Sequence, residues 1–174
     1  MYPNYHLDRL SFLIIDDNTY MRRIIRSILN GVGIRNITEA EDGAAGFEAM
    51  THYNPDIVIL DMLMPIFDGI EFLNLIRTPT NEHAFIPIIV ISAHLESEKI
   101  IAARNAGANE FLAKPVASKD LLSRIINVID NPRPFVNTPA YFGPCRRRAN
   151  IKIKFRDRRK NNDEKFLVPM ATQT

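Results

Sequence analysis

The 174-residue sequence predicts an α/β fold built around one parallel, doubly wound sheet. Its apolar runs are short and continuous rather than alternating, which is typical of strands covered on both faces. Segments with helical spacing separate these runs, and right-handed crossovers turn such an order into a doubly wound sheet. Polar or charged residues follow several runs, at the strand ends where open α/β sheets place their ligands.

Five runs have the length and composition of strands. Four are strongly apolar, and each is bounded by polar or turn-forming residues. The fifth run, residues 36–38, is weaker. The four strong runs are SFLII (11–15), DIVIL (56–60), IPIIVIS (86–92) and EFLA (110–113).

Amphipathic helices are expected between and after the strands. Apolar residues recur there at i, i+3, i+4 and i+7, which is the spacing of one helix face. Glycines at positions 31, 43 and 107 fall at expected helix ends or turns. The order is therefore five strand–helix pairs. The two clearest helical stripes are Met21, Ile24, Ile25, Ile28 and Leu29, and Leu121, Leu122, Ile125, Ile126 and Ile129.

The composition excludes several classes of protein. No apolar run reaches the ~18–20 residues needed to span a bilayer, and the N-terminus lacks the pattern of a signal peptide. The only cysteine, Cys145, cannot form an internal disulfide. These features predict a cytoplasmic protein with no membrane span.

Charge divides the chain into two parts. Residues 1–130 hold 11 Lys/Arg and 17 Asp/Glu, a net charge of −6, whereas residues 131–174 hold 11 and 3, a net charge of +8. We expect one domain over 1–130 and a basic, proline-containing, largely irregular arm over 131–174, with local docking through Phe135, Tyr141 and Phe142. The opposite charges favour folding of the arm onto the acidic domain over binding of nucleic acid or an anionic membrane.

Candidate functional residues lie at four strand ends. The first strand is followed by Asp16 and Asp17, the third by Asp61 and the fifth by Lys114, and the fourth ends in Ser92. Clustered carboxylates repel one another unless a cation joins them, and oxygen ligands suit Mg²⁺. Asp61 could then act as a nucleophile toward phosphorus. Taken singly, each residue could be a helix cap or a loop residue. To explain all of them in this way would require four coincidences, one at each of the four strand ends.

The segments IIDDN, DMLMPIFDG, VISA and FLAKP resemble the receiver domain of bacterial two-component response regulators, over about residues 10–130. The resemblance implies a flavodoxin-like fold of five parallel strands and five helices. It also implies that Asp61 accepts a phosphoryl group from a histidine kinase or a histidine phosphotransfer protein. Asp16, Asp17, Asp61 and the backbone carbonyl of Leu63 would hold Mg²⁺. Ser92 and Lys114 would contact the phosphoryl oxygens, and the peptide bond before Pro115 would be cis.

The same resemblance implies how the signal leaves the site. Ser92 and Phe111 would form the switch, although Phe111 is equally explained as a core residue. The output face would be the fourth helix, fifth strand and fifth helix, about residues 96–130, which would bind a downstream protein. Leu63 and His94 would flank the phosphoacceptor, and the apolar Leu63 predicts slow self-dephosphorylation. Arg22, Arg23 and Arg26 are candidates for docking the phosphodonor, or simply form a solvated helix face.

On this reading the protein phosphorylates and dephosphorylates itself but is not an enzyme with an external substrate. A magnesium phosphohydrolase is a weaker interpretation, because Asn18 stands where such enzymes carry their general acid. A nucleotide-binding domain is a second weaker interpretation, because Gly31-Val32-Gly33 follows a helix, Asn36 stands at the third glycine position of GxGxxG, and no GxxxxGK(S/T) occurs. The remaining alternative is a phosphorylation-independent, receiver-like adaptor that acts through its basic tail. That tail, YFGPCRRR onward, resembles tails on some stand-alone alphaproteobacterial receivers.

Overall fold

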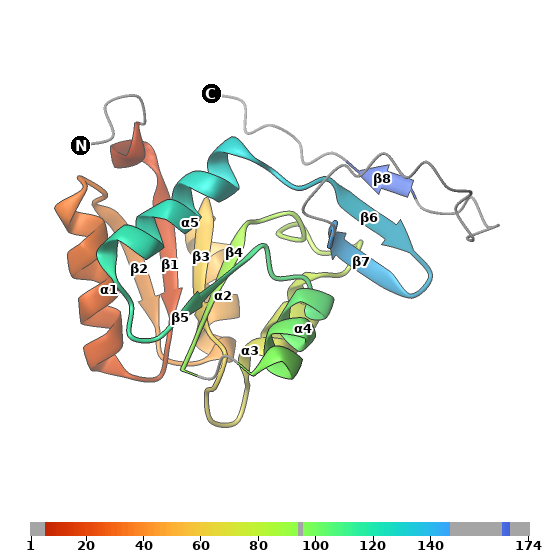
Figure 1. The fold of residues 1–174 in the computed structure, drawn as a ribbon, viewed down its shortest axis with the longest axis horizontal. Coiled ribbons are helices and arrows are strands. Elements are labelled where there is room, and N and C mark those ends of the chain that lie inside the picture. The colour runs from red at the N-terminus through yellow and green to blue at the C-terminus, as the bar shows by residue number, and fades with distance from the viewer. Residues whose placement is uncertain (1–5, 94–95, 147–164, 168–174) are drawn as a thin grey trace.

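The computed structural model describes residues 6–93, 96–146 and 165–167. Five parallel strands form the central sheet in the order β2-β1-β3-β4-β5 (Figure 1). Non-sequential neighbours such as β1 and β3 mark the doubly wound topology predicted from the sequence. The strands are β1 (Ser11–Ile15), β2 (Asn36–Ala40), β3 (Ile57–Asp61), β4 (Ile88–Ser92) and β5 (Glu110–Ala113).

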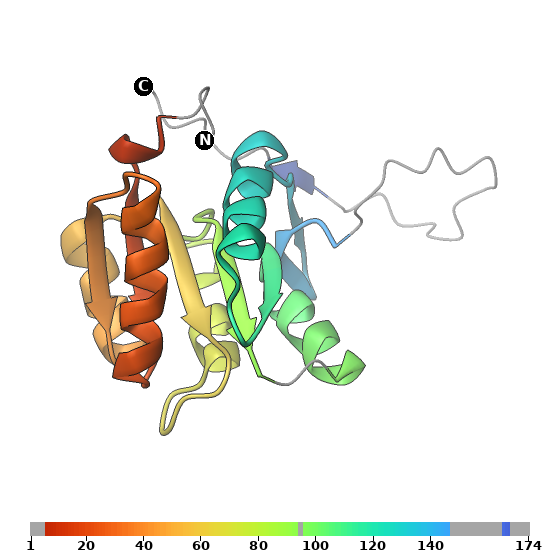
Figure 2. The same ribbon diagram turned by 60° about the vertical axis from the view of Figure 1, so that its left-hand side comes forward.

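Five α-helices cover the sheet in two layers. Helices α1 and α5 pack on one face, and α2, α3 and α4 pack on the other (Figure 2). A short 3₁₀ helix, η1 (Leu7–Arg9), precedes β1. The α-helices are α1 (Thr19–Gly31), α2 (Gly43–Tyr53), α3 (Gly69–Ile76), α4 (Ser97–Ala106) and α5 (Ser118–Asp130). None of the helices within the described residues is long and apolar enough to cross a membrane.

The two layers explain why the strand sequences are continuously apolar. In β1, Phe12 and Ile14 belong to the core beneath α1 and α5, whereas Leu13 and Ile15 belong to the core beneath α2, α3 and α4. Successive side chains of a strand point to opposite faces, so a strand covered on both faces needs apolar residues at every position. Every residue of β3 and β4 is buried for this reason.

Short polar side chains fix where the first three α-helices begin. The Asn18 side chain accepts hydrogen bonds from the backbone N–H groups of Tyr20 and Met21, at 2.9 and 3.2 Å. Asp42 caps α2 in the same way, and Asp68 with Glu71 forms a reciprocal capping box at α3. These caps follow directly from local sequence, and two of them lie in the loops that carry the site residues.

The C-terminal segment differs from the prediction of a largely irregular arm. Strands β6 (Phe135–Thr138) and β7 (Tyr141–Pro144) form an antiparallel hairpin, and β8 (Lys165–Leu167) pairs with the other edge of β6. The prediction is therefore wrong for residues 135–144. The expected local docking holds for Phe135 and Phe142, whose rings contact each other and Phe85. Residues 147–164 and 168–174, which hold most of the basic residues of the arm, lie outside the described residues.

The hairpin is ordered because it buries aromatic side chains against the main domain. Phe135 is 1% exposed, and its ring centroid lies 4.8 Å from that of Phe85 and 5.9 Å from that of Phe142. Phe85 lies just before β4, so the partner is 50 positions away in the sequence. Proline content and missing periodicity could not reveal a contact with so distant a partner.

Two arginines complete this junction. The buried guanidinium of Arg77 donates to the carbonyls of Gly107, Ala84 and Ile86 and to the side chain of Asn109, and it lies 5.2 Å from the centroid of the Phe135 ring. Burial lowers the pKa of Arg77 to about 9. Arg133 forms a 3.3 Å ion pair with the buried Glu110 at the start of β5. The hairpin is thus anchored near the N-terminal ends of β4 and β5.

Candidate functional site

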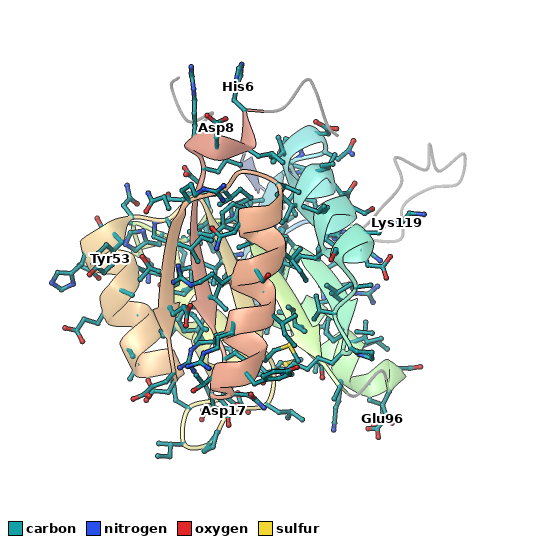
Figure 3. All side chains as sticks on the ribbon, turned by 90° about the vertical axis from the view of Figure 1, so that its left-hand side faces the viewer. His6, Asp8, Asp17, Tyr53, Glu96 and Lys119 are labelled. Atoms are coloured by element: carbon teal, nitrogen blue, oxygen red, sulfur yellow. The ribbon has the colours of Figure 1, made fainter. Side chains whose placement is uncertain are left out.

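The carboxyl ends of the parallel strands meet at one end of the molecule. Figure 3 shows Asp17 and Glu96 at this end and His6 and Asp8 at the opposite end. Asp16 and Asp17 follow β1, Asp61 is the last residue of β3, Ser92 is the last residue of β4, and Lys114 follows β5. The docked hairpin lies away from this edge, so the described part of the C-terminal segment does not cover the site (Figure 1).

Three carboxylates form a cluster at this edge. One ligand atom from each of Asp16, Asp17 and Asp61 lies within 4.8 Å of the others. Asp16 and Asp61 are 1% and 5% exposed, whereas Asp17 is open to solvent. Two buried carboxylates and one accessible carboxylate offer hard oxygen ligands with an entry path. This donor set fits a cation such as Mg²⁺, which is bound through few protein oxygens and retains waters.

Lys114 joins two of these carboxylates. Its Nζ lies 3.0 Å from Asp16 Oδ2 and 2.9 Å from Asp61 Oδ2. The peptide bond from Lys114 to Pro115 is cis, as the resemblance implied. The sequence suggested a lysine beside Asp61, but the second ion pair, to Asp16, was not anticipated. A cation shared by two carboxylates offsets the repulsion that burial strengthens.

The environment of Asp61 disfavours its charged form. Burial is the largest cause and raises its pKa, and the negative charge of Asp16 acts in the same direction. Lys114 and the backbone N–H of Leu63 partly offset this rise by donating to the carboxylate. For Lys114, burial acts to lower the pKa, but the two carboxylates outweigh it and raise the pKa above the usual value. A further cation in the cluster would therefore favour ionised Asp61.

Ser92 and Phe111 lie on the same side of the sheet. Ser92 is fully buried and is in register with Ala113 of β5, whereas Phe111 is in register with Val90. Residues two apart in a strand share a face. Phe111 is half-buried and packs against the core beneath α2, α3 and α4. It therefore has a core contact and still borders the strand that carries Ser92.

A tight loop holds the end of β3 in place. The backbone N–H of Gly69 donates to the carbonyl of Met62 at 3.1 Å. A Cβ at position 69 would lie 2.6 Å from the Asp61 carbonyl oxygen, closer than side chains tolerate. Glycine is required here because two backbone segments approach closely. The loop also orients Leu63, whose side chain is exposed while its N–H reaches Asp61.

The three arginines of α1 have different surroundings. Arg22 and Arg26 both form ion pairs with Glu39 of β2, and Arg22 also donates to the backbone carbonyl of Asp16 at 2.7 Å. Arg23 is exposed. The sequence did not reveal the Arg22–Asp16 contact, because no local pattern links a helix side chain to a preceding carbonyl. His94 lies outside the described residues.

Comparison with known proteins shows which family the sequence matches. The sequence profile of the response regulator receiver domain matches residues 12–126. Chemotaxis protein CheY-3 of Vibrio cholerae serotype O1 is 32% identical over 121 residues, which cover 70% of this chain and 92% of CheY-3. The KDP operon transcriptional regulatory protein KdpE of Escherichia coli K12 is 38% identical over 113 residues, 65% of this chain and 48% of KdpE.

Solved structures show the same relationship. The receiver domain of Francisella response regulator 1452 superposes with a TM-score of 0.63 at 26% identity and covers 70% of this chain and 98% of that domain. Vibrio cholerae chemotaxis protein CheY4 gives a TM-score of 0.64 at 26% identity over 68% of this chain and 98% of CheY4.

The fold and the acidic cluster at the strand ends are those of a signalling domain of two-component systems. The chain belongs to the response regulator receiver domain family. Its relatives include regulators that are little longer than the receiver itself and others, such as KdpE, that extend well beyond it.

Proposed function

We propose that this protein is a phosphorelay response regulator whose phosphoacceptor is Asp61. The donor would be a phosphohistidine of a histidine kinase or a histidine phosphotransfer protein. One observation carries the proposal: Lys114 lies within 3.0 Å of both Asp16 and Asp61, beside the accessible Asp17, at the carboxyl edge of the sheet. The receiver would comprise residues 1–130 and the C-terminal extension residues 131–174.

The proposed chemistry is the transfer of a phosphoryl group from the donor histidine to Asp61. A carboxylate oxygen of Asp61 attacks phosphorus, the phosphorus–nitrogen bond of the donor breaks, and the imidazole leaves with a proton from solvent. An acyl phosphate forms on Asp61. In self-dephosphorylation, water attacks phosphorus, the phosphorus–oxygen bond breaks, and carboxylate and inorganic phosphate are released. No external substrate is turned over, so the protein is a switch rather than an ordinary enzyme.

Each group at the site has a part in this transfer. Asp16, Asp17, Asp61 and the Leu63 carbonyl would hold Mg²⁺, which neutralises charge on the phosphoryl oxygens when it is bound. The ammonium of Lys114 has three N–H donors. Lys114 would therefore be able to donate to a phosphoryl oxygen in exchange for one of its carboxylate partners. Ser92 lies one strand over, where its hydroxyl can donate to the same group.

The output would follow from a change in packing. Phosphorylation adds charge and acceptor atoms at the buried end of β3. Reorientation of Ser92 toward the phosphoryl group would free space beside β5, into which Phe111 could turn. Phe111 has no hydroxyl with which to hydrogen-bond to a partner, so the partner would recognise the change through packing alone. The surface formed by α4, β5 and α5 would then bind a downstream protein. The exposed Leu63 offers no polar group to an attacking water, which favours slow dephosphorylation.

Intact mass spectrometry tests the proposal directly. The full chain is incubated with acetyl phosphate, with MgCl₂ or with EDTA, and compared with Asp61→Asn. The expected result is one phosphoryl adduct on the wild type that requires Mg²⁺ and is absent from the variant. An adduct that persists in Asp61→Asn would place the acceptor elsewhere. Absence of any adduct, with acetyl phosphate and with phosphoramidate, would favour a phosphorylation-independent adaptor that acts through its basic tail.

A further inference from the structure

Arg22 connects the acidic cluster to the neighbouring strand. Its Nη1 donates to the backbone carbonyl of Asp16 at 2.7 Å, and its Nε donates to Glu39 Oε2 at 3.1 Å. Its Nη2 donates to Thr19 Oγ1 at 3.2 Å. The side chain is only 12% exposed. One planar guanidinium thus holds three acceptors, from the loop, the start of α1 and β2.

Glu39 is itself held from two sides. It forms ion pairs with both Arg22 and Arg26, and Arg26 also donates to the Ile37 carbonyl at 3.0 Å. Burial acts to raise the pKa of Glu39, but hydrogen bonds from Arg26 and Arg22 outweigh it and keep the pKa below its usual value. Glu39 therefore remains ionised at neutral pH. It is a fixed anchor on β2, since its backbone is paired with β1.

The contact with Asp16 completes the restraint of that residue. Its N–H donates to the Ala40 carbonyl at 3.2 Å. Its carboxylate accepts from the Asn18 N–H at 2.8 Å and from Lys114. The Asp16 carbonyl is held by Arg22. With the carbonyl fixed, the direction of the chain into Asp17 is set as well.

We infer that Arg22 is a positioning residue for the metal site, which it serves by fixing the Asp16–Asp17 loop against Glu39. The inference deepens the proposed function and rests on it. Arg22 does not reach the metal or the phosphoryl group; it acts through the Asp16 backbone. Partners behind metal ligands typically change metal affinity by about 10–100-fold when they are removed.

Electrostatics alone predicts the opposite sign, which makes the inference testable. Arg22 is a cation near a cation site, so its charge by itself weakens metal binding. If fixing the Asp16–Asp17 loop is the larger effect of Arg22, Arg22→Met will weaken Mg²⁺ binding. If the repulsion between Arg22 and the metal is the larger effect, Arg22→Met will strengthen Mg²⁺ binding. Arg22→Lys separates the two effects further, because lysine retains the charge but cannot span three acceptors with a planar fork.

The experiment is an NMR titration of the ¹⁵N-labelled full chain with MgCl₂, without a phosphodonor. We expect Mg²⁺ affinity to fall roughly 10-fold in Arg22→Met and by a similar factor in Arg22→Lys. Arg23→Met is the matched control for charge, since Arg23 is the exposed neighbour on the same helix. The Mg²⁺ affinity of Arg23→Met should equal that of the wild type.

A second measurement separates positioning from general damage to the fold. Phosphorylation by acetyl phosphate is followed as a function of MgCl₂ concentration. A positioning role shifts the Mg²⁺ concentration at half-maximal rate and leaves the maximal rate near that of the wild type. Melting temperatures in EDTA check that each variant is folded, and Glu39→Gln, which leaves Arg22 in place but weakens its anchor, should shift the titration less.

Tighter or unchanged Mg²⁺ binding in Arg22→Met, or wild-type binding in Arg22→Lys, would overturn the inference. Because the titration contains no phosphodonor, it is informative even if Asp61 is not phosphorylated. Failure of the proposed function would appear as normal Mg²⁺ binding without an adduct, whereas failure of this inference would appear as an adduct with unaltered Mg²⁺ dependence in the variants.

Discussion

Replacing Phe135 by alanine tests whether the C-terminal hairpin is part of the folded domain. The ring is fully buried and contacts Phe85, Phe142 and the guanidinium of Arg77. Removal of a buried phenylalanine ring costs about 3–5 kcal/mol where the surroundings cannot collapse. The hairpin is joined to the domain through residues 131–134 and can shift to reduce the cavity, so we expect a loss of about 3 kcal/mol, the lower end of that range.

Urea unfolding of the full chain, followed by far-UV circular dichroism, measures this loss. For a chain of this size, about 3 kcal/mol corresponds to a melting temperature lower by roughly 6–12 °C. Tyr53→Ala is the matched control, because Tyr53 is an exposed aromatic residue at the end of α2. It should change stability by no more than about 0.5 kcal/mol. A loss for Phe135→Ala as small as that of the control would refute the docking described above.

Three further outcomes are expected at the site. Gly69→Ala should reduce phosphorylation by acetyl phosphate, since its Cβ would lie 2.6 Å from the Asp61 carbonyl oxygen, whereas Gly31→Ala has nothing within 4 Å and should behave as wild type; equal rates would contradict the steric argument. The raised pKa of Asp61 means that the folded state binds its proton more tightly than the unfolded state, so stability falls as pH rises through that pKa. Asp61→Asn should therefore melt higher than wild type at neutral pH in EDTA, and the difference should shrink in acid; a pH-independent difference would exclude this cause. Lys114→Met removes the cation shared by Asp16 and Asp61, so MgCl₂ should raise its melting temperature more than that of the wild type, and an equal rise would argue that the lysine and the metal act independently.

Local sequence was sufficient to predict the central sheet. The runs at 11–15 and 110–113 match β1 and β5 residue for residue, because a strand covered on both faces leaves a continuous apolar signal. The run predicted at 86–92 is shorter in the structure, where β4 begins at Ile88. Pro87 lacks a backbone donor, and Val58 of β3 donates to its carbonyl just before the strand starts.

The members of the site could also be predicted, since parallel strands deliver their carboxyl ends to one edge. Asp16, Asp61 and Lys114 meet there as expected. Their pairing could not be predicted, because it depends on how far each loop carries its side chain. The contact of Arg22 with the Asp16 carbonyl could not be predicted either, because it depends on the position of β2 relative to α1.

The sequence by itself therefore determined the order of strands and helices and the set of chemical groups at the edge of the sheet, because both follow from periodicity and from position along each strand. Only the tertiary structure decided which charges pair and that residues 135–144 form a docked hairpin. Phe135 is stabilised by Phe85 and Arg77, which are distant in the sequence. No local pattern encodes such contacts, since their free energy arises only when the chain has brought the partners together.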